Sequence, residues 1–146
     1  MTSQAQSYGS AAIRVLMAMI FILSGLSKIA AADTMRGYME AMGVPGILLW
    51  PAILFEIGAG LLIIVGYKTR IVAALLAGFS VLTAAIFHNQ LADQIQMIMF
   101  LKNLSMAGGF ALLACVGAGT LSVDARAQKW GARLNPAARD MLVVGK

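Results

Sequence analysis

Four long apolar segments dominate the sequence, at about residues 11–29, 47–65, 71–87 and 98–116. At a rise of about 1.5 Å per residue, a helix of about 20 residues crosses a hydrocarbon core of about 30 Å. None of the segments alternates apolar and polar residues, as the strands of a membrane barrel do. Charged residues make up only 12% of the chain, whereas soluble domains contain about 25%. The sequence therefore predicts an all-α fold, a bundle of four transmembrane helices.

The distribution of Lys and Arg predicts the orientation of this bundle. If both termini lie on one side of the membrane, that side holds eight of the eleven basic residues. The other side holds only Lys28, Arg36 and Lys102. Cytoplasmic loops of membrane proteins are enriched in Lys and Arg. Both termini are therefore predicted to be cytoplasmic.

A cleaved signal peptide is the alternative interpretation of the first segment. The small residues at positions 30–32 resemble a cleavage site. Lys28, however, stands between these residues and the apolar run. We therefore interpret the first segment as a retained membrane span.

The two links on the outer side contain apolar residues of their own. In the first link these residues recur at the i, i+3, i+4, i+7 spacing of an amphipathic helix, at Met35, Tyr38, Met39 and Met42. The spacing predicts a short interfacial helix over 33–42, with Asp33 as its N-cap and with Gly43 and Pro45 after its end. The second link, 89–97, is interpreted either as an interfacial turn or as the frayed start of the fourth span.

The composition changes after residue 121. Residues 122–146 carry five basic and two acidic residues together with Trp130. We therefore divide the chain into a membrane domain, 1–121, and a basic cytoplasmic tail, 122–146. Such a tail is attracted to anionic lipids of the inner leaflet.

Ionisable residues inside the spans are the strongest indication of function, because burying them in a membrane is costly. Glu56 lies near the middle of the second span, about 13 Å from either end. A carboxylate at this depth must be paired, protonated or in contact with a wet cavity. Arg14 lies about one turn inside the first span and either pairs with Glu56 or anchors the inner end of that span.

Further polar residues lie in the outer half of the predicted bundle. Lys28 ends the first span, His88 ends the third, and Lys102 and Asn103 lie about one turn into the fourth. Four antiparallel helices place these residues and Glu56 in the outer half of one bundle, although spacing alone does not establish contact. The alternative for Lys28 and His88 is that both are ordinary interface residues with side chains at the membrane surface.

A carboxylate, a histidine and amines around one cavity can bind an anion or a polar headgroup, or exchange protons with a quinone. Glu56 and His88 are therefore the candidate proton-handling residues. The candidate ligand-binding residues are Arg14, Lys28, Lys102 and Asn103. The sequence lacks a dinucleotide motif, a pair of histidines for haem and a set of cysteines for an iron–sulfur cluster. No resident cofactor is therefore predicted; quinone is the candidate ligand, and electrons must come from a partner.

Methionines in the outer half allow a second interpretation. Thioethers are suitable ligands for Cu(I), but methionine also fills gaps in apolar packing. We interpret these methionines, Met35, Met39, Met42, Met97 and Met99, as packing residues and predict no metal site.

Over residues 8–126 the chain resembles the DoxX family of small four-helix membrane proteins. The motifs that carry this resemblance are, in chain order, Arg14 with the run FILSGLSK, GVP at 43–45, Glu56, GYKTR at 66–70, His88, FLKN at 100–103 and GAGTLSVD at 117–124. In the last motif Ala118 stands where the family usually has proline. The order and spacing of the motifs, rather than any one of them, support the resemblance.

The resemblance implies a multi-pass protein of the bacterial inner membrane. It also implies a link to sulfur metabolism, quinol oxidation or oxidative-stress complexes. We therefore expect an accessory or quinone-interacting subunit of a membrane redox system, with the lipid bilayer and a redox protein as partners. The alternatives are a small transporter, a binding protein for lipids or other hydrophobic compounds, and a membrane anchor for a soluble enzyme. A homo-oligomer fits each alternative, and no nucleic-acid partner is expected.

Overall fold

The computed structural model describes residues 3–134, and this part of the chain consists of helices and the links between them. In chain order the helices are α1 (Ser3–Ala30), α2 (Ala32–Ala41), the short 3-10 helix η1 (Gly46–Leu48), α3 (Leu49–Val65), α4 (Thr69–Phe87), α5 (Gln94–Val116) and α6 (Val123–Leu134). Four segments are long and apolar enough to cross a membrane: α1, η1 with α3, α4, and α5. The predicted all-α fold with four spanning helices is confirmed.

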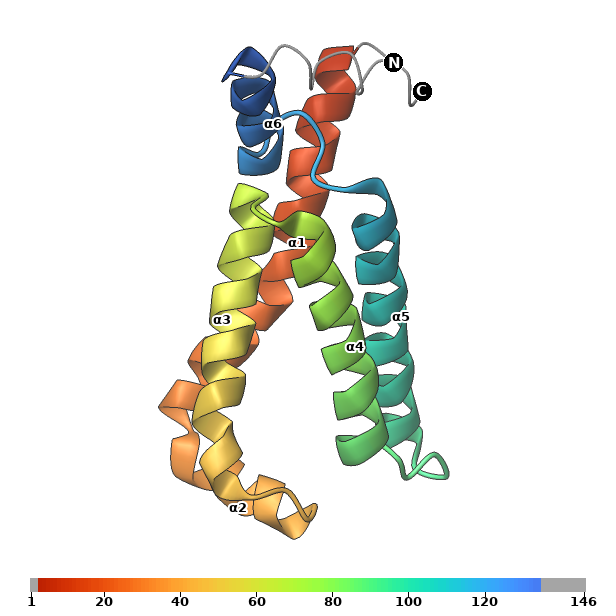
Figure 1. Ribbon diagram of the computed structural model, residues 1–146. Coiled ribbons are helices and arrows are strands. Elements are labelled where there is room, and N and C mark those ends of the chain that lie inside the picture. Colours follow the sequence, from red (N-terminus) through yellow and green to blue (C-terminus); the bar gives the residue numbers. More distant parts are fainter. Residues whose placement is uncertain (1–2, 135–146) are drawn as a thin grey trace.

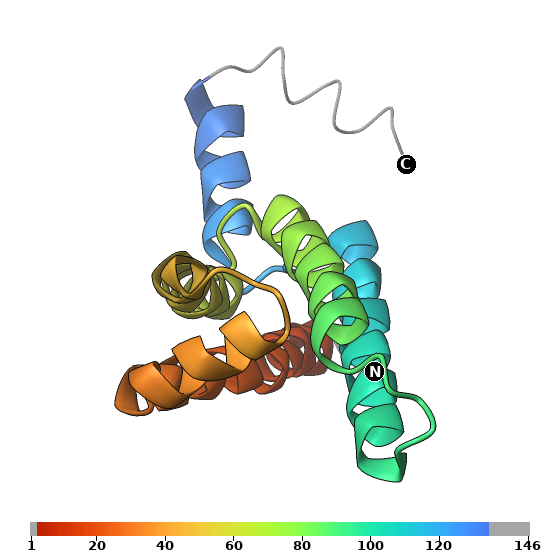
Figure 2. The ribbon, with the colours of Figure 1, turned by 90° about the horizontal axis from the view of Figure 1, so that it is seen from below.

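Two helix pairs form the bundle. Helix α1 packs along α3 and α4 packs along α5, whereas contacts between the two pairs are few. The pairs converge near α6 and diverge toward α2, which gives the molecule the shape of a wedge (Figure 1). Seen along the bundle, the two pairs lie side by side and α2 reaches from the α1–α3 pair toward α4 (Figure 2). We refer to the two ends as the α6 end and the α2 end.

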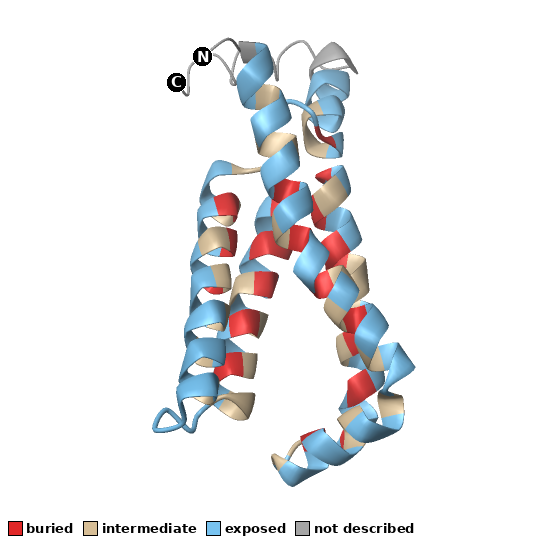
Figure 3. Ribbon diagram, turned by 180° about the vertical axis from the view of Figure 1, so that it is seen from behind, coloured by how far each residue is buried: buried red, intermediate tan, exposed pale blue. Residues whose placement is uncertain are grey.

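The hydrophobic core lies in the half of the bundle nearest the α6 end. Its buried members come from all four spanning helices: Ala18, Phe21, Ala59, Ile63, Val72, Ala73, Leu76, Phe110 and Leu113. The buried residues of α5 all fall in its second half, and the first half of this helix has none (Figure 3). A smaller cluster of Met39, Leu49 and Ile53 fixes α2 against α3. Four-helix packing is therefore complete at one end of the molecule only.

Two of the predicted helix boundaries differ from the structure. Helix α1 begins at Ser3 rather than near residue 11, because its polar first turns pack against the link between α5 and α6, where Ser10 donates a hydrogen bond to the Ala118 carbonyl. Helix α5 begins at Gln94 rather than near residue 98, so the last residues of the second outer link form the start of the fourth spanning helix, one of the two alternatives for that link. Its N-cap is Asp93, whose side chain accepts a hydrogen bond from the Gln96 backbone at 2.8 Å. Both helices thus extend beyond their apolar cores, α1 beside a tertiary hydrogen bond and α5 behind an N-cap.

The interfacial helix predicted over 33–42 is present as α2, but its predicted cap is wrong. The N-cap is Ala31, which makes no side-chain capping bond, and Asp33 lies within the first turn. An acidic residue in that turn still interacts favourably with the helix dipole. After the helix, Gly43 adopts a φ of 76°, which turns the chain toward η1.

Candidate ligand cavity

A cavity of about 490 Å³ occupies the space between the helix pairs toward the α2 end. Most of its wall is apolar and comes from α1, α2, α3, α4 and α5. Seven of the side chains that line it carry polar groups: Ser24, Lys28, Tyr38, Glu56, Thr83, His88 and Asn103. Its volume lies within the range of small-molecule sites, about 300–1,000 Å³, as does the combination of an apolar wall with a few polar groups.

Lys28 and Glu56 form an ion pair on the wall of this cavity. The Lys28 Nζ atom lies 2.8 Å from each carboxylate oxygen of Glu56 and 2.6 Å from Ser24 Oγ. The side chain of Glu56 is only 4% exposed and that of Lys28 is 24% exposed. Helix side chains tilt toward the helix N-terminus, so Lys28, at the C-terminal end of α1, is directed into the span. The ammonium group thus provides the partner that a buried carboxylate requires.

His88 lies on the cavity wall at the end of α4, where it is held by a second side chain. Its Nδ1 atom lies 2.9 Å from Gln96 Oε1. With the amide oxygen of Gln96 as the acceptor, Nδ1 donates this hydrogen bond, and Nε2 is the ring nitrogen outside this contact. Nε2 is therefore the atom of His88 that can meet a polar group of a ligand in the cavity.

Asn103 and Lys102 are adjacent in sequence but differ in position. Asn103 lines the cavity, where its Oδ1 atom lies 3.4 Å from Thr83 Oγ1 and its amide nitrogen donates to the Met99 carbonyl. Lys102 is exposed and is not among the residues that line the cavity. The cavity therefore brings together Glu56, His88, Lys28 and Asn103 of the predicted site residues.

Arg14 lies outside this group, at the α6 end, and does not pair with Glu56. It is 1% exposed, and its guanidinium group donates to the carbonyls of Ile63 and Ile64 at 3.2 and 3.0 Å and to the carbonyl of Leu121. A cation at the last carbonyls of α3 interacts favourably with the helix dipole. Of the two alternatives for Arg14, the structure supports the anchor, which joins α1, α3 and the α5–α6 link.

Asp124 completes this anchor from α6. Its carboxylate accepts hydrogen bonds from the backbone amides of Lys68 and Thr69, at 2.7 and 2.9 Å, and so caps the start of α4. Burial raises the pKa of Asp124, but the hydrogen bonds from Thr69 and Lys68 and the charge of Arg14 outweigh burial and hold that pKa below its usual value. The first turn of the tail predicted to begin at residue 122 thus contains a residue, Asp124, that is hydrogen-bonded to the spanning helices.

The methionines divide between the cavity and the surface. Met35 and Met39 line the cavity and belong to the small apolar cluster that fixes α2. Met97 and Met99 are exposed on α5. Within residues 3–134, no group of three or more His, Cys, Asp or Glu side chains could hold a metal ion.

Ser24 and Tyr38 also line the cavity and were not among the predicted site residues. Ser24 precedes Lys28 by four residues, a spacing that places both on one helix face, so this contact could have been inferred. Tyr38 donates from its hydroxyl to the Phe87 carbonyl at 3.2 Å and stacks on the Phe87 ring, with centroids 5.6 Å apart. This contact joins α2 to α4 beside the cavity, and no pattern in the sequence predicts it.

Four spanning helices around a largely apolar cavity with a buried ion pair define a small polytopic membrane protein with a cavity between its helices. The DoxX family model matches residues 9–89. The inner membrane protein YqjF of Escherichia coli K12 is 45% identical over 119 residues, covering 82% of this chain and 92% of YqjF. The inner membrane protein YphA of the same organism is 37% identical over 120 residues, covering 77% of this chain and 86% of YphA. No solved structure matches the chain.

The chain belongs to the DoxX family and is an integral inner-membrane protein. The family resemblance deduced from the motifs is confirmed, as is the predicted location.

Proposed function

We propose that the cavity binds the headgroup of a quinone or quinol, and that the protein is an accessory subunit of a membrane redox system. The observation that carries this proposal is the Lys28–Glu56 ion pair, held in the wall of an otherwise largely apolar cavity. An apolar wall suits the ring and the tail of a quinone. The few polar groups suit its two oxygens, which exchange hydrogen bonds and protons during the redox reaction.

The positions of Glu56 and His88 on the cavity wall favour proton exchange with a quinol. Oxidation of a quinol to a quinone releases two protons and two electrons. Glu56 and the free Nε2 atom of His88 are the groups that accept these protons, and reduction reverses both transfers. The electrons pass to or from a redox partner protein. Lys28 and Asn103 orient the ring oxygens.

Exposed apolar side chains of the cavity wall suit the hydrophobic tail of the ligand. Ile20 of α1 and Leu82 of α4 line the cavity and are 50% and 57% exposed. These two residues lie on different helix pairs. A tail that left the cavity between the pairs would contact both side chains on its way to the lipid.

Binding of a short-tailed benzoquinol to the protein in detergent tests the proposal. The same ring with both hydroxyls methylated is the control ligand, because it keeps the apolar contacts and loses the protons. We expect the quinol to bind at least tenfold more tightly than the ether, and His88→Gln and the double variant K28M/E56Q to remove this preference. The matched control is Lys102→Gln, which removes a charge outside the cavity. Equal binding of the two ligands would refute quinol recognition and favour a general carrier of hydrophobic compounds.

Purification of the tagged chain from its own membranes in mild detergent tests the subunit role. A dehydrogenase or an oxidase that co-purifies in fixed proportion supports it. A chain that is recovered alone, as a monomer or homo-oligomer, contradicts an obligate subunit and leaves a self-contained binding protein or transporter.

A further inference from the structure

A second hollow lies at the α6 end, away from the cavity between the helix pairs. It has a volume of about 630 Å³ and is lined by the start of α4, the end of α5, the link that follows and the first turns of α6. We call it the basic groove. Because α4 begins and α5 ends beside it, the groove lies where two membrane spans leave the hydrocarbon region. This is the level of the lipid headgroups.

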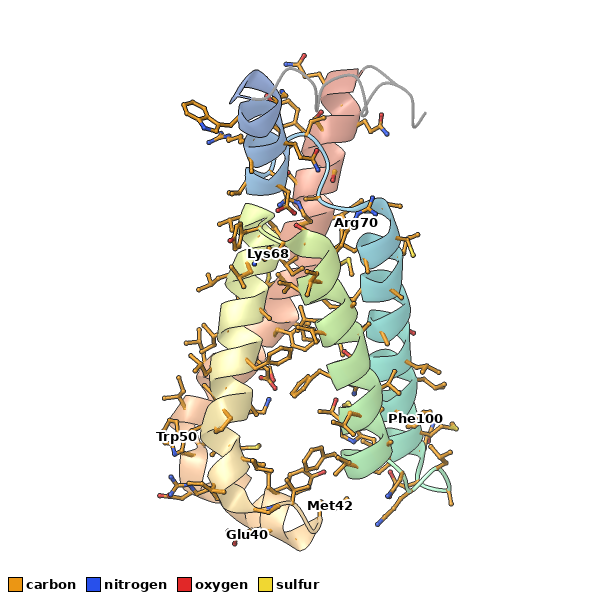
Figure 4. All side chains as sticks on the ribbon, in the orientation of Figure 1. Glu40, Met42, Trp50, Lys68, Arg70 and Phe100 are labelled. Atoms are coloured by element: carbon orange, nitrogen blue, oxygen red, sulfur yellow. The ribbon has the colours of Figure 1, made fainter. Side chains whose placement is uncertain are left out.

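Two cations line the basic groove. Lys68 and Arg70 are both exposed and lie at the α6 end of the bundle, on either side of the start of α4 (Figure 4). Neither forms a salt bridge within the described residues 3–134. The Arg70 side chain lies against Gly117, where a Cβ atom would be 3.3 Å from its Nε atom. The link that follows α5 therefore holds this side chain beside the groove.

The carboxylate that lines the groove forms no salt bridge with these cations within residues 3–134. Asp124 directs its two oxygens to the backbone amides of Lys68 and Thr69. The Lys68 ammonium lies 5.8 Å from the centre of the Tyr67 ring, a contact that adds no negative charge. The groove therefore holds two cationic side chains without an acidic partner in the part of the chain that the structure describes.

The side of the groove that faces the spans is apolar. Ile71 is 62% exposed and Val116 is 65% exposed, and both line the groove. They continue into the lipid-facing surfaces of α4 and α5. A site with cations on one side and exposed aliphatic side chains on the other matches an amphiphile better than a soluble anion.

We infer that the basic groove binds an anionic phospholipid, with its phosphate between Lys68 and Arg70 and an acyl chain along Ile71 and Val116. Guanidinium groups bind phosphate through paired hydrogen bonds, and lysine binds it as a point charge. Basic pockets beside the ends of membrane helices are suited to such headgroups. This site is separate from the cavity between the helix pairs and does not depend on the function proposed for that cavity.

Lipid binding to delipidated protein in neutral detergent, followed by native mass spectrometry, tests this site. The probes are phosphatidylglycerol, phosphatidylcholine and inorganic phosphate. The variant is K68Q/R70Q. The matched control is R36Q/K102Q, which removes the same charge at the α2 end.

We expect phosphatidylglycerol to bind more tightly than phosphatidylcholine and to lose about 25-fold in affinity in K68Q/R70Q, since each basic residue near anionic lipid contributes about fivefold. The control variant should lose less than about threefold. Equal loss in both variants would show a general charge effect and overturn the site. Inorganic phosphate that displaces the lipid at equal concentration would also overturn it, in favour of a soluble anion. Melting by circular dichroism confirms that both variants are folded.

Discussion

The Lys28–Glu56 ion pair permits a quantitative test of how this bundle tolerates charge. Lys28→Met leaves the Glu56 carboxylate, only 4% exposed, without its cation. Removing one partner of a buried pair costs about 3–5 kcal/mol. Glu56→Gln leaves the Lys28 ammonium with Ser24 and partial exposure, and the loss of a charged hydrogen bond costs about 2 kcal/mol.

The double variant K28M/E56Q separates the interaction energy of the ion pair from the effects of the two single substitutions. Replacing both charges with neutral groups of similar size is often neutral or stabilising. We therefore expect the double variant to lie within about 1 kcal/mol of the wild type, well short of the sum of the two single changes. The free energy of unfolding is measured by reversible denaturation in mixed micelles, with helix content as the signal.

The result that refutes this reasoning is additivity. If Lys28→Met and Glu56→Gln each cost less than about 1 kcal/mol and their effects add, the two groups are solvated separately and no buried pair exists. Lys102→Met serves as the control, because that side chain is exposed. It should change the free energy of unfolding by less than about 0.5 kcal/mol.

Three further predictions concern the two ends of the bundle. Gly66→Ala should destabilise the protein by at least about 2 kcal/mol, because Gly66 has a φ of 71° and a Cβ there overlaps Arg14. Gly78→Ala, in open space within α4, should stabilise the protein by up to about 1 kcal/mol in the same denaturation assay. The lowered pKa of Asp124 means that its capping stabilises the fold above about pH 4 and that this contribution is lost as pH falls further. The stability difference between wild type and Asp124→Asn should therefore shrink below pH 4, and a difference that is constant down to pH 2 contradicts the cap. Tyr38→Phe removes a hydrogen bond and should speed hydrogen exchange of the α2 amides. Tyr38→Ala also removes the ring stacking on Phe87 and should speed this exchange further. Unchanged exchange in both variants would show that the contact does not hold α2 against α4.

The spanning helices can be predicted from the sequence, because few backbone conformations are stable in lipid. Backbone polar groups in hydrocarbon must bond within their own segment, so an apolar run of about 20 residues becomes a helix whatever its neighbours are. The position of Glu56 along its helix follows in the same way from the constant rise per residue. The amphipathic spacing around Met35 and Met39 likewise predicts α2.

The partners of the polar residues depend on tertiary structure. Residue spacing determines depth, whereas contact also requires the rotation of each helix and the gap between helices. Lys102 and Asn103 share a depth, but neighbouring residues point about 100° apart around a helix, and only Asn103 faces the cavity. Arg14 and Glu56 are both ionisable and within spans, yet each is bound by a group near its own end of the bundle.

The wedge itself is the feature that no local pattern determines. All four spans are apolar around most of their circumference, so the sequence does not distinguish a side chain that meets another helix from one that meets lipid. Packing decides this. The two helix pairs meet where Phe21, Ile63 and Phe110 fill the core, and the pairs separate where Lys28 and Glu56 face a cavity. The sequence alone thus determined which segments cross the membrane, and only the packing of those segments decided where the cavity lies.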